Sequence, residues 1–141
     1  EYPHSIDSKF SYEKIGKSPL GVIYRPVAKV LFRSIKNSNW VETTMIVDTG
    51  ADFTILPRVL TLRLEISLRD DCVKHLTSGV GGNQTIYIYK RKVKARIGQM
   101  ERMVPIAFFD DNNVPPLLGR LGFLETFDTE FLKTHVVVFK K

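Results

Sequence analysis

The chain has 141 residues, of which 43% are hydrophobic and 26% charged, so it is long enough to bury the core of one domain. No segment approaches the roughly 18 uncharged apolar residues of a membrane-spanning helix. The formal net charge of +6 permits a nucleic-acid partner but does not by itself establish one.

The N-terminal part of the sequence divides at a proline. Residues 1–25 have mixed polarity with Pro and Gly among them, and we expect an N-terminal arm or irregular lead-in there, followed by one domain over residues 26–141. That domain opens with alternating side chains of strand type, and a turn signal at 37–39 separates them from a second extended segment at 40–47. The two segments predict a hairpin that delivers Asp48 to a loop.

The rest of the chain alternates short apolar runs with turn signals. We expect strands over 103–109 and 135–139, and a long extended segment after the glycine cluster at 79–82. Apolar side chains near helical spacing predict one helix over 120–128. Many short strands, closely spaced turns and little helix indicate an all-β barrel or sandwich.

Two patterns that suggest cofactor or metal chemistry lack the context they need. The cluster Gly79-Val80-Gly81-Gly82 has no following Gly-Lys-Ser/Thr, and a β-rich run stands where a phosphate-binding helix would begin. Cys72-x-x-His75 is half of a metal-site pattern without a second Cys-His cluster, and a lone cysteine excludes an internal disulfide. We expect no cofactor and no metal, and a reducing compartment is compatible with this without being required.

The densest basic run, 90–96, has the period of a half-buried strand. Its basic side chains alternate with Val93 and Ala95, which is typical of a strand with one solvated face. Few aromatic side chains accompany the run, so we interpret it as a charged outer face and expect no nucleic-acid partner.

An acid at the end of an apolar run is the most informative local feature. Asp48 follows Met45-Ile46-Val47 and is followed directly by Thr49 and Gly50. A carboxylate leaving a buried strand is costly unless it is hydrogen-bonded. Asp48 could serve only as a turn-capping acid, or it could carry acid–base chemistry with a partner elsewhere.

Three segments, taken in order, carry a family resemblance. Asp48-Thr49-Gly50-Ala51 resembles the active-site signature of retropepsin-like aspartic proteases. Gly79-Val80-Gly81-Gly82 resembles the tip of their flap. Leu117-Leu118-Gly119-Arg120 resembles the segment that leads into their C-terminal helix. The chain is most similar to the cellular or prokaryotic single-domain type, in which an aspartate often stands at the place of Leu121. The resemblance spans about residues 26–139.

The resemblance implies a closed β-barrel with a flap hairpin and one short C-terminal helix, and it implies an aspartic endopeptidase acting on extended peptides. Two aspartates about 3 Å apart cannot both ionise, so they share a proton and supply both an acid and a base. This sequence has one Asp-Thr-Gly, so the second carboxylate would be Asp48 of another copy in a homodimer.

Further roles follow from the same resemblance. The Thr49 hydroxyl would hydrogen-bond across the dimer axis, and the Gly50 carbonyl would accept a hydrogen bond from the substrate. Asp52 would bind the substrate main chain and pair with Arg120, whose neighbour Gly119 gives structural support. The other implied substrate-binding residues are Ala51, Gly79, Val80, Gly81 and Gly82, with Phe53, Ile55 and Leu117 lining apolar pockets.

Two rival functions remain open at this point. One is a retropepsin-fold dimer with weak or absent proteolysis that binds peptides or serves as an assembly module, although the intact Asp48 motif argues for catalysis. The other is a basic barrel that binds nucleic acid, which rests on charge alone. In the same way, Asp52 and Arg120 could be an unrelated surface pair, and the glycine cluster an inert hairpin tip.

Overall fold

The computed structural model describes residues 7–79 and 82–141, and they are mostly β, with 55% strand and 9% helix. The strands are β1 (Ser8–Ser11), β2 (Glu13–Ser18), β3 (Gly21–Arg25), β4 (Val27–Arg33), β5 (Trp40–Val47), β6 (Ile55–Leu56), β7 (Cys72–Gly79), β8 (Gly82–Tyr89), β9 (Val93–Ile97), β10 (Met100–Val104), β11 (Ala107–Phe109), β12 (Leu117–Leu118), β13 (Asp128–Leu132) and β14 (Val136–Lys140). The helical segments are α1 (Leu60–Leu64), α2 (Leu68–Asp71) and the 3₁₀ turn η1 (Leu124–Thr126).

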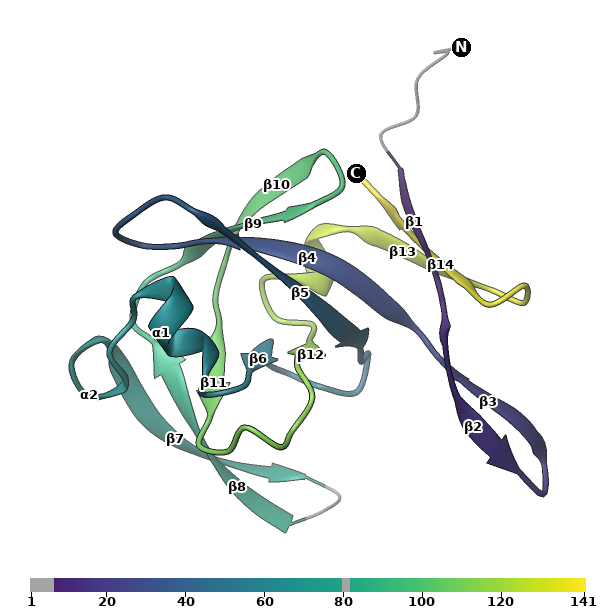
Figure 1. Cartoon of the computed structure of the whole chain (residues 1–141), viewed down its shortest axis with the longest axis horizontal. Coiled ribbons are helices and arrows are strands. Elements are labelled where there is room, and N and C mark those ends of the chain that lie inside the picture. The colour runs from purple at the N-terminus through teal and green to yellow at the C-terminus, as the bar shows by residue number, and fades with distance from the viewer. Residues whose placement is uncertain (1–6, 80–81) are drawn as a thin grey trace.

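The main sheet has nine strands in the order β10-β9-β4-β5-β12-β6-β11-β8-β7. It curls around its concave face as a half-barrel, with β10 and β7 as its outer strands (Figure 1). This establishes the predicted β-rich class. The short strand β12 lies in the middle of the order, parallel to β5 and antiparallel to β6.

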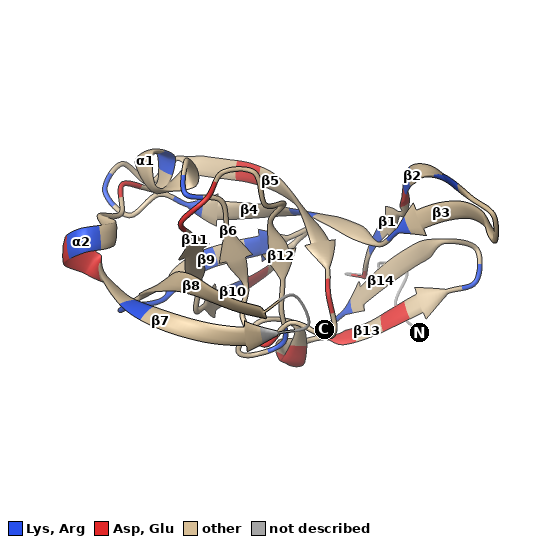
Figure 2. Ribbon diagram, turned by 90° about the horizontal axis from the view of Figure 1, so that it is seen from below, with Lys and Arg blue, Asp and Glu red and all other residues tan. Residues whose placement is uncertain are grey.

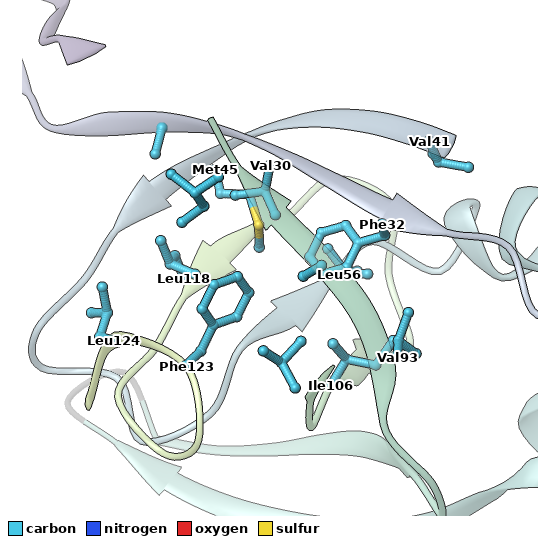
Figure 3. Close-up of a cluster of buried hydrophobic side chains, with 14 of the residues drawn as sticks. Val30, Phe32, Val41, Met45, Leu56, Val93, Ile106, Leu118, Phe123 and Leu124 are labelled. Carbon is cyan, nitrogen blue, oxygen red and sulfur yellow. The ribbon is translucent and has the colours of Figure 1, made fainter. Parts of the chain in front are cut away.

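The core fills the inside of this curl. Strand β4 alternates as its sequence predicts, with Val30 and Phe32 fully buried and Lys29 exposed between such positions. Side chains from distant segments meet them, among them Met45 of β5 and Phe123 from the C-terminal part (Figure 3). The Phe32 and Phe123 rings pack edge to face with centroids 6.3 Å apart, so the segment before η1 closes the core.

Two smaller sheets lie to one side of the half-barrel (right in Figure 1). One has the order β1-β14-β13, and the Phe10 ring packs edge to face on Phe139. The other is the β2–β3 hairpin. The segment for which the sequence predicts an arm or irregular lead-in therefore contains three strands. Strand β1 pairs with β14 at the far end of the chain, and β2 and β3 pair with each other.

The helix predicted over 120–128 is reduced to the single 3₁₀ turn η1. Gly122 has φ +68, and a Cβ there would lie 2.6 Å from Pro105, so the chain makes a tight turn against that proline where a helix would continue. From Asp128 onward it becomes strand β13. The apolar spacing instead serves packing: Phe123 and Phe127 are buried, while Phe131 on β13 is 44% exposed.

Candidate active site

Asp48 leaves strand β5 at a point held on two sides by backbone hydrogen bonds. The amide of Val47 donates to the carbonyl of Pro26 (2.9 Å), and the amide of Asp48 donates to the carbonyl of Leu118 (3.1 Å). Leu118 belongs to the central strand β12 and is fully buried. Its hydrogen bond therefore ties the backbone of Asp48 to the core.

The Asp48 carboxylate is hydrogen-bonded within its own turn. Its Oδ1 accepts from the amide of Gly50 at 2.9 Å, and the Asp48 carbonyl accepts from the amide of Ala51 at 3.2 Å. A Cβ on Gly50 would stand 3.3 Å from Oδ1, a tight contact that favours glycine there. Asp48 is half-buried, whereas Thr49 and Gly50 are exposed. The carboxylate thus has the hydrogen bond that its position requires.

A second segment braces the residues after this turn. The amide of Gly119 donates to the buried hydroxyl of Thr54 (3.1 Å), and the amide of Arg120 donates to the carbonyl of Ala51 (3.0 Å). A Cβ on Gly119 would lie only 2.2 Å from the carbonyl oxygen of Phe53. Only glycine permits this approach without displacing backbone.

The structure brings Asp52 and Arg120 together. Nη2 of Arg120 donates a hydrogen bond to Oδ1 of Asp52. The Arg120 side chain is 44% exposed and the Asp52 side chain is 61% exposed. An ion pair this exposed adds little stability. Its effect is to orient the Asp52 carboxylate beside the Asp48 turn.

These segments line a cleft of about 580 Å³ that the β7–β8 hairpin borders. Of the residues singled out in the sequence, the cleft is lined by Asp48, Gly50, Ala51, Asp52, Phe53, Ile55, Gly82 and Leu117. Thr49, Gly119 and Arg120 are not among its lining residues. Gly79 pairs with Gly82 at the end of β7, and Val80 and Gly81 fall outside the described residues.

The sequence reasoning missed four polar residues of the cleft, Thr77, Ser78, Asn83 and Gln84. They flank the glycine cluster on both sides, and the β7–β8 register pairs Thr77 with Gln84 and Ser78 with Asn83. Their proximity to the cluster was a usable signal. It becomes specific only once the structure shows that the β7–β8 hairpin and the Asp48 turn line the same cleft.

The basic run on β9 is engaged with neighbouring side chains. Nη2 of Arg96 lies 2.6 Å from a carboxylate oxygen of Glu101 on β10, Lys94 lies 3.9 Å from the other, and the Arg96 guanidinium stacks 4.3 Å from the Trp40 ring centroid. The hydrogen bond from Arg96 lowers the pKa of Glu101. Figure 2 shows basic and acidic residues spread over many elements rather than gathered on one.

Cys72 and His75 do not converge. They are three residues apart on β7, so their side chains fall on opposite faces: Cys72 is buried and His75 is exposed, with its ring 5.7 Å from that of Phe53. Burial, and next the charge of Asp71, raise the pKa of the Cys72 thiol to about 11. The thiol is therefore a weak nucleophile at neutral pH.

The described part of the chain contains neither a metal-binding cluster nor a membrane-spanning helix. Across residues 7–79 and 82–141, no group of three or more His, Cys, Asp or Glu side chains is arranged to hold a metal ion. Over the same residues, each helix is too short to cross a membrane.

Replacing Gly119 by alanine tests the close approach to Phe53. We expect Gly119→Ala to lower the free energy of unfolding by about 1–3 kcal/mol, because the new methyl group overlaps fixed backbone. Gly16→Ala is the matched control, since a Cβ at Gly16 meets nothing within 4 Å. Thermal and urea unfolding of both variants measure this, and equal stabilities would contradict the tight contact.

The buried thiol offers a separate check. Its raised pKa leaves less thiolate at pH 8 than an ordinary cysteine has, so iodoacetamide should label native Cys72 at least about tenfold more slowly than the urea-unfolded chain. Mass spectrometry of timed samples gives both rates. Equal rates would mean that Cys72 is not buried as described.

The middle of the chain matches a known protein family. Residues 34–121 match the family described as aspartyl protease. A search of curated proteins found no match. The matched segment begins directly after β4 and covers more than half of the chain. It contains both the Asp48 turn and the residues Gly119 and Arg120 that hydrogen-bond to the segment after that turn. The resemblance read from the sequence is confirmed at the level of the family, and the chain belongs to the retropepsin-like aspartyl proteases.

Proposed function

We propose that the protein is an aspartic endopeptidase that hydrolyses peptide bonds in extended polypeptide segments. The observation that carries this is the Asp48 carboxylate, held by the amide of Gly50 at 2.9 Å on the wall of a cleft of about 580 Å³. Family membership makes peptidase activity the expected chemistry of such a cleft. Residues 26–141 would form the protease domain, with residues 1–25 as its N-terminal arm.

The chemistry needs a second carboxylate. One aspartate, ionised, takes a proton from a water whose oxygen attacks the scissile carbonyl carbon. The other aspartate, protonated, donates its proton to the carbonyl oxygen, which gives a tetrahedral diol. The C–N bond then breaks as the proton taken from water passes to the leaving nitrogen, and a hydroxyl of the diol returns a proton to the second aspartate. Two adjacent carboxylates hold one proton between them, so their titration belongs to the pair.

The second carboxylate would be Asp48 of another copy of the chain. The sequence has one Asp-Thr-Gly, and a two-fold axis through the site would place two identical turns face to face. The exposure of Thr49 beside half-buried Asp48 supports this arrangement, because the threonine hydroxyl is available to the partner's turn. The homodimer is thus part of the proposed site.

Substrate would lie between the Asp48 turn and the β7–β8 hairpin, which we propose as the flap. An extended peptide can add to such a hairpin as a further strand. Asp52, oriented by Arg120, would bind its main chain, with the Gly50 carbonyl as a second acceptor. The apolar side chains of Phe53, Ile55 and Leu117 on the cleft wall favour apolar substrate residues.

The test of catalysis is Asp48→Asn. This change preserves shape but removes the carboxylate, so we expect cleavage of a peptide library to fall at least about a thousandfold while the melting temperature stays close to that of the wild type. Asp128→Asn, an exposed acid on β13, is the control that should retain activity. Cleavage by the Asp48→Asn variant would overturn the assignment. Peptide binding without cleavage by the wild type would favour the rival peptide-binding module.

The test of the shared site is its dependence on association. Specific activity should rise with protein concentration as dimer forms, and sedimentation velocity should show a dimer that a pepstatin-type inhibitor stabilises. Mixing wild type with excess Asp48→Asn chain should suppress activity, because the active site of a mixed dimer would have only one Asp48 carboxylate. A chain that stays monomeric with inhibitor bound, and is active, would exclude the two-chain site.

A further inference from the structure

We propose that a second cavity, adjoining the Asp48 cleft at Phe53, binds a large apolar side chain of the substrate. This side chain belongs to a residue away from the two that flank the scissile bond. The inference rests on the proposed peptidase function and adds to it a substrate class: extended segments with an apolar residue at this distal position.

The cavity has about 220 Å³ and an apolar lining. Its walls are Phe53, Thr54, Ile88, Pro105, Ile106, Ala107 and Leu121. The oxygens of Thr54 are already hydrogen-bonded to the protein. The Thr54 hydroxyl accepts from the amide of Gly119, and the Thr54 carbonyl accepts from the amide of Ala107 at 2.9 Å. The volume is below the roughly 300 Å³ at which sites for whole small molecules begin, so the space suits one side chain.

The cavity is built on fixed backbone. Leu121, which forms one wall, donates its amide to the carbonyl of Asp52 at 2.9 Å. The next residue, Gly122, is tight against Pro105 on another wall, where a Cβ would lie 2.6 Å from the proline ring. Binding there would therefore cost little rearrangement, which is the condition for a preformed subsite.

Phe53 joins this cavity to the cleft. Its side chain lines both spaces, and its ring contacts His75 on β7 edge to face. The turn that carries Leu121 is also the turn in which Arg120 orients Asp52, a residue of the cleft wall. One side chain and one turn thus belong to both sites.

An extended peptide has the spacing to use both spaces. Its alternate side chains point the same way and lie about 7 Å apart, so a residue further along the strand can enter a neighbouring pocket. Leu121 is 47% exposed at the cavity rim, and an apolar substrate side chain would cover that surface. This continuity favours the substrate itself as occupant over a separate ligand.

The experiment uses a fluorescein-labelled decapeptide library in which one position at a time is fixed as Leu or as the similarly sized Asn. At one distal position we expect Leu to raise kcat/KM about tenfold over Asn, mainly through KM, because the pocket acts by binding. Leu121→Asp should reduce that ratio to about one. Leu62→Asp, at a 78% exposed position on α1, is the matched control and should keep it.

Binding to the Asp48→Asn variant separates the pocket from catalysis. In that background the Leu peptides should bind about tenfold tighter than the Asn peptides by fluorescence anisotropy, and adding Leu121→Asp should remove the difference. Cleavage without a distal apolar preference, or a preference that survives Leu121→Asp, overturns the subsite and leaves the peptidase standing. Apolar-selective binding without any wild-type cleavage supports the pocket and overturns the proposed catalysis.

Discussion

The site depends on one close backbone contact, that of Gly119 with the Phe53–Thr54 peptide. A side chain at position 119 would overlap the Phe53 carbonyl at 2.2 Å, so the two segments can lie together only because this residue is glycine. The contact places β12 between β5 and β6, where the carbonyl of Leu118 holds the amide of Asp48. Backbone packing in the core thereby positions an acid at the surface of the cleft.

The same contact fixes the two residues that follow Gly119. Arg120 and Leu121 follow Gly119 and donate their amides to the carbonyls of Ala51 and Asp52. Arg120 then turns its guanidinium to the Asp52 carboxylate, while Leu121 lines the second cavity. The residue that orients Asp52 and a residue that lines the second cavity are thus consecutive in one turn.

What the sequence predicted well was encoded locally. Asp48 ends an apolar strand before Thr49 and Gly50, and such a pattern specifies both the turn and its acid without reference to the rest of the chain. What it missed depends on distant partners: β1 is a strand because β14 pairs with it, and the helical spacing after Gly119 is overridden by the turn at Gly122 against Pro105. Cleft residues such as Thr77 required the hairpin register.

The proposed dyad also explains why the Asp48 turn is braced by backbone rather than by charge. In a symmetric site each copy must place its carboxylate within about 3 Å of an identical one, where like charges repel unless a proton is shared. A turn held by flexible side-chain ion pairs would relax away from that repulsion. The hydrogen bonds from Gly50 to the carboxylate and from Asp48 to Leu118 resist it, because moving Asp48 would disturb a strand buried in the core. In the proposed dimer, the stability of the whole sheet would therefore oppose the repulsion between the two acids.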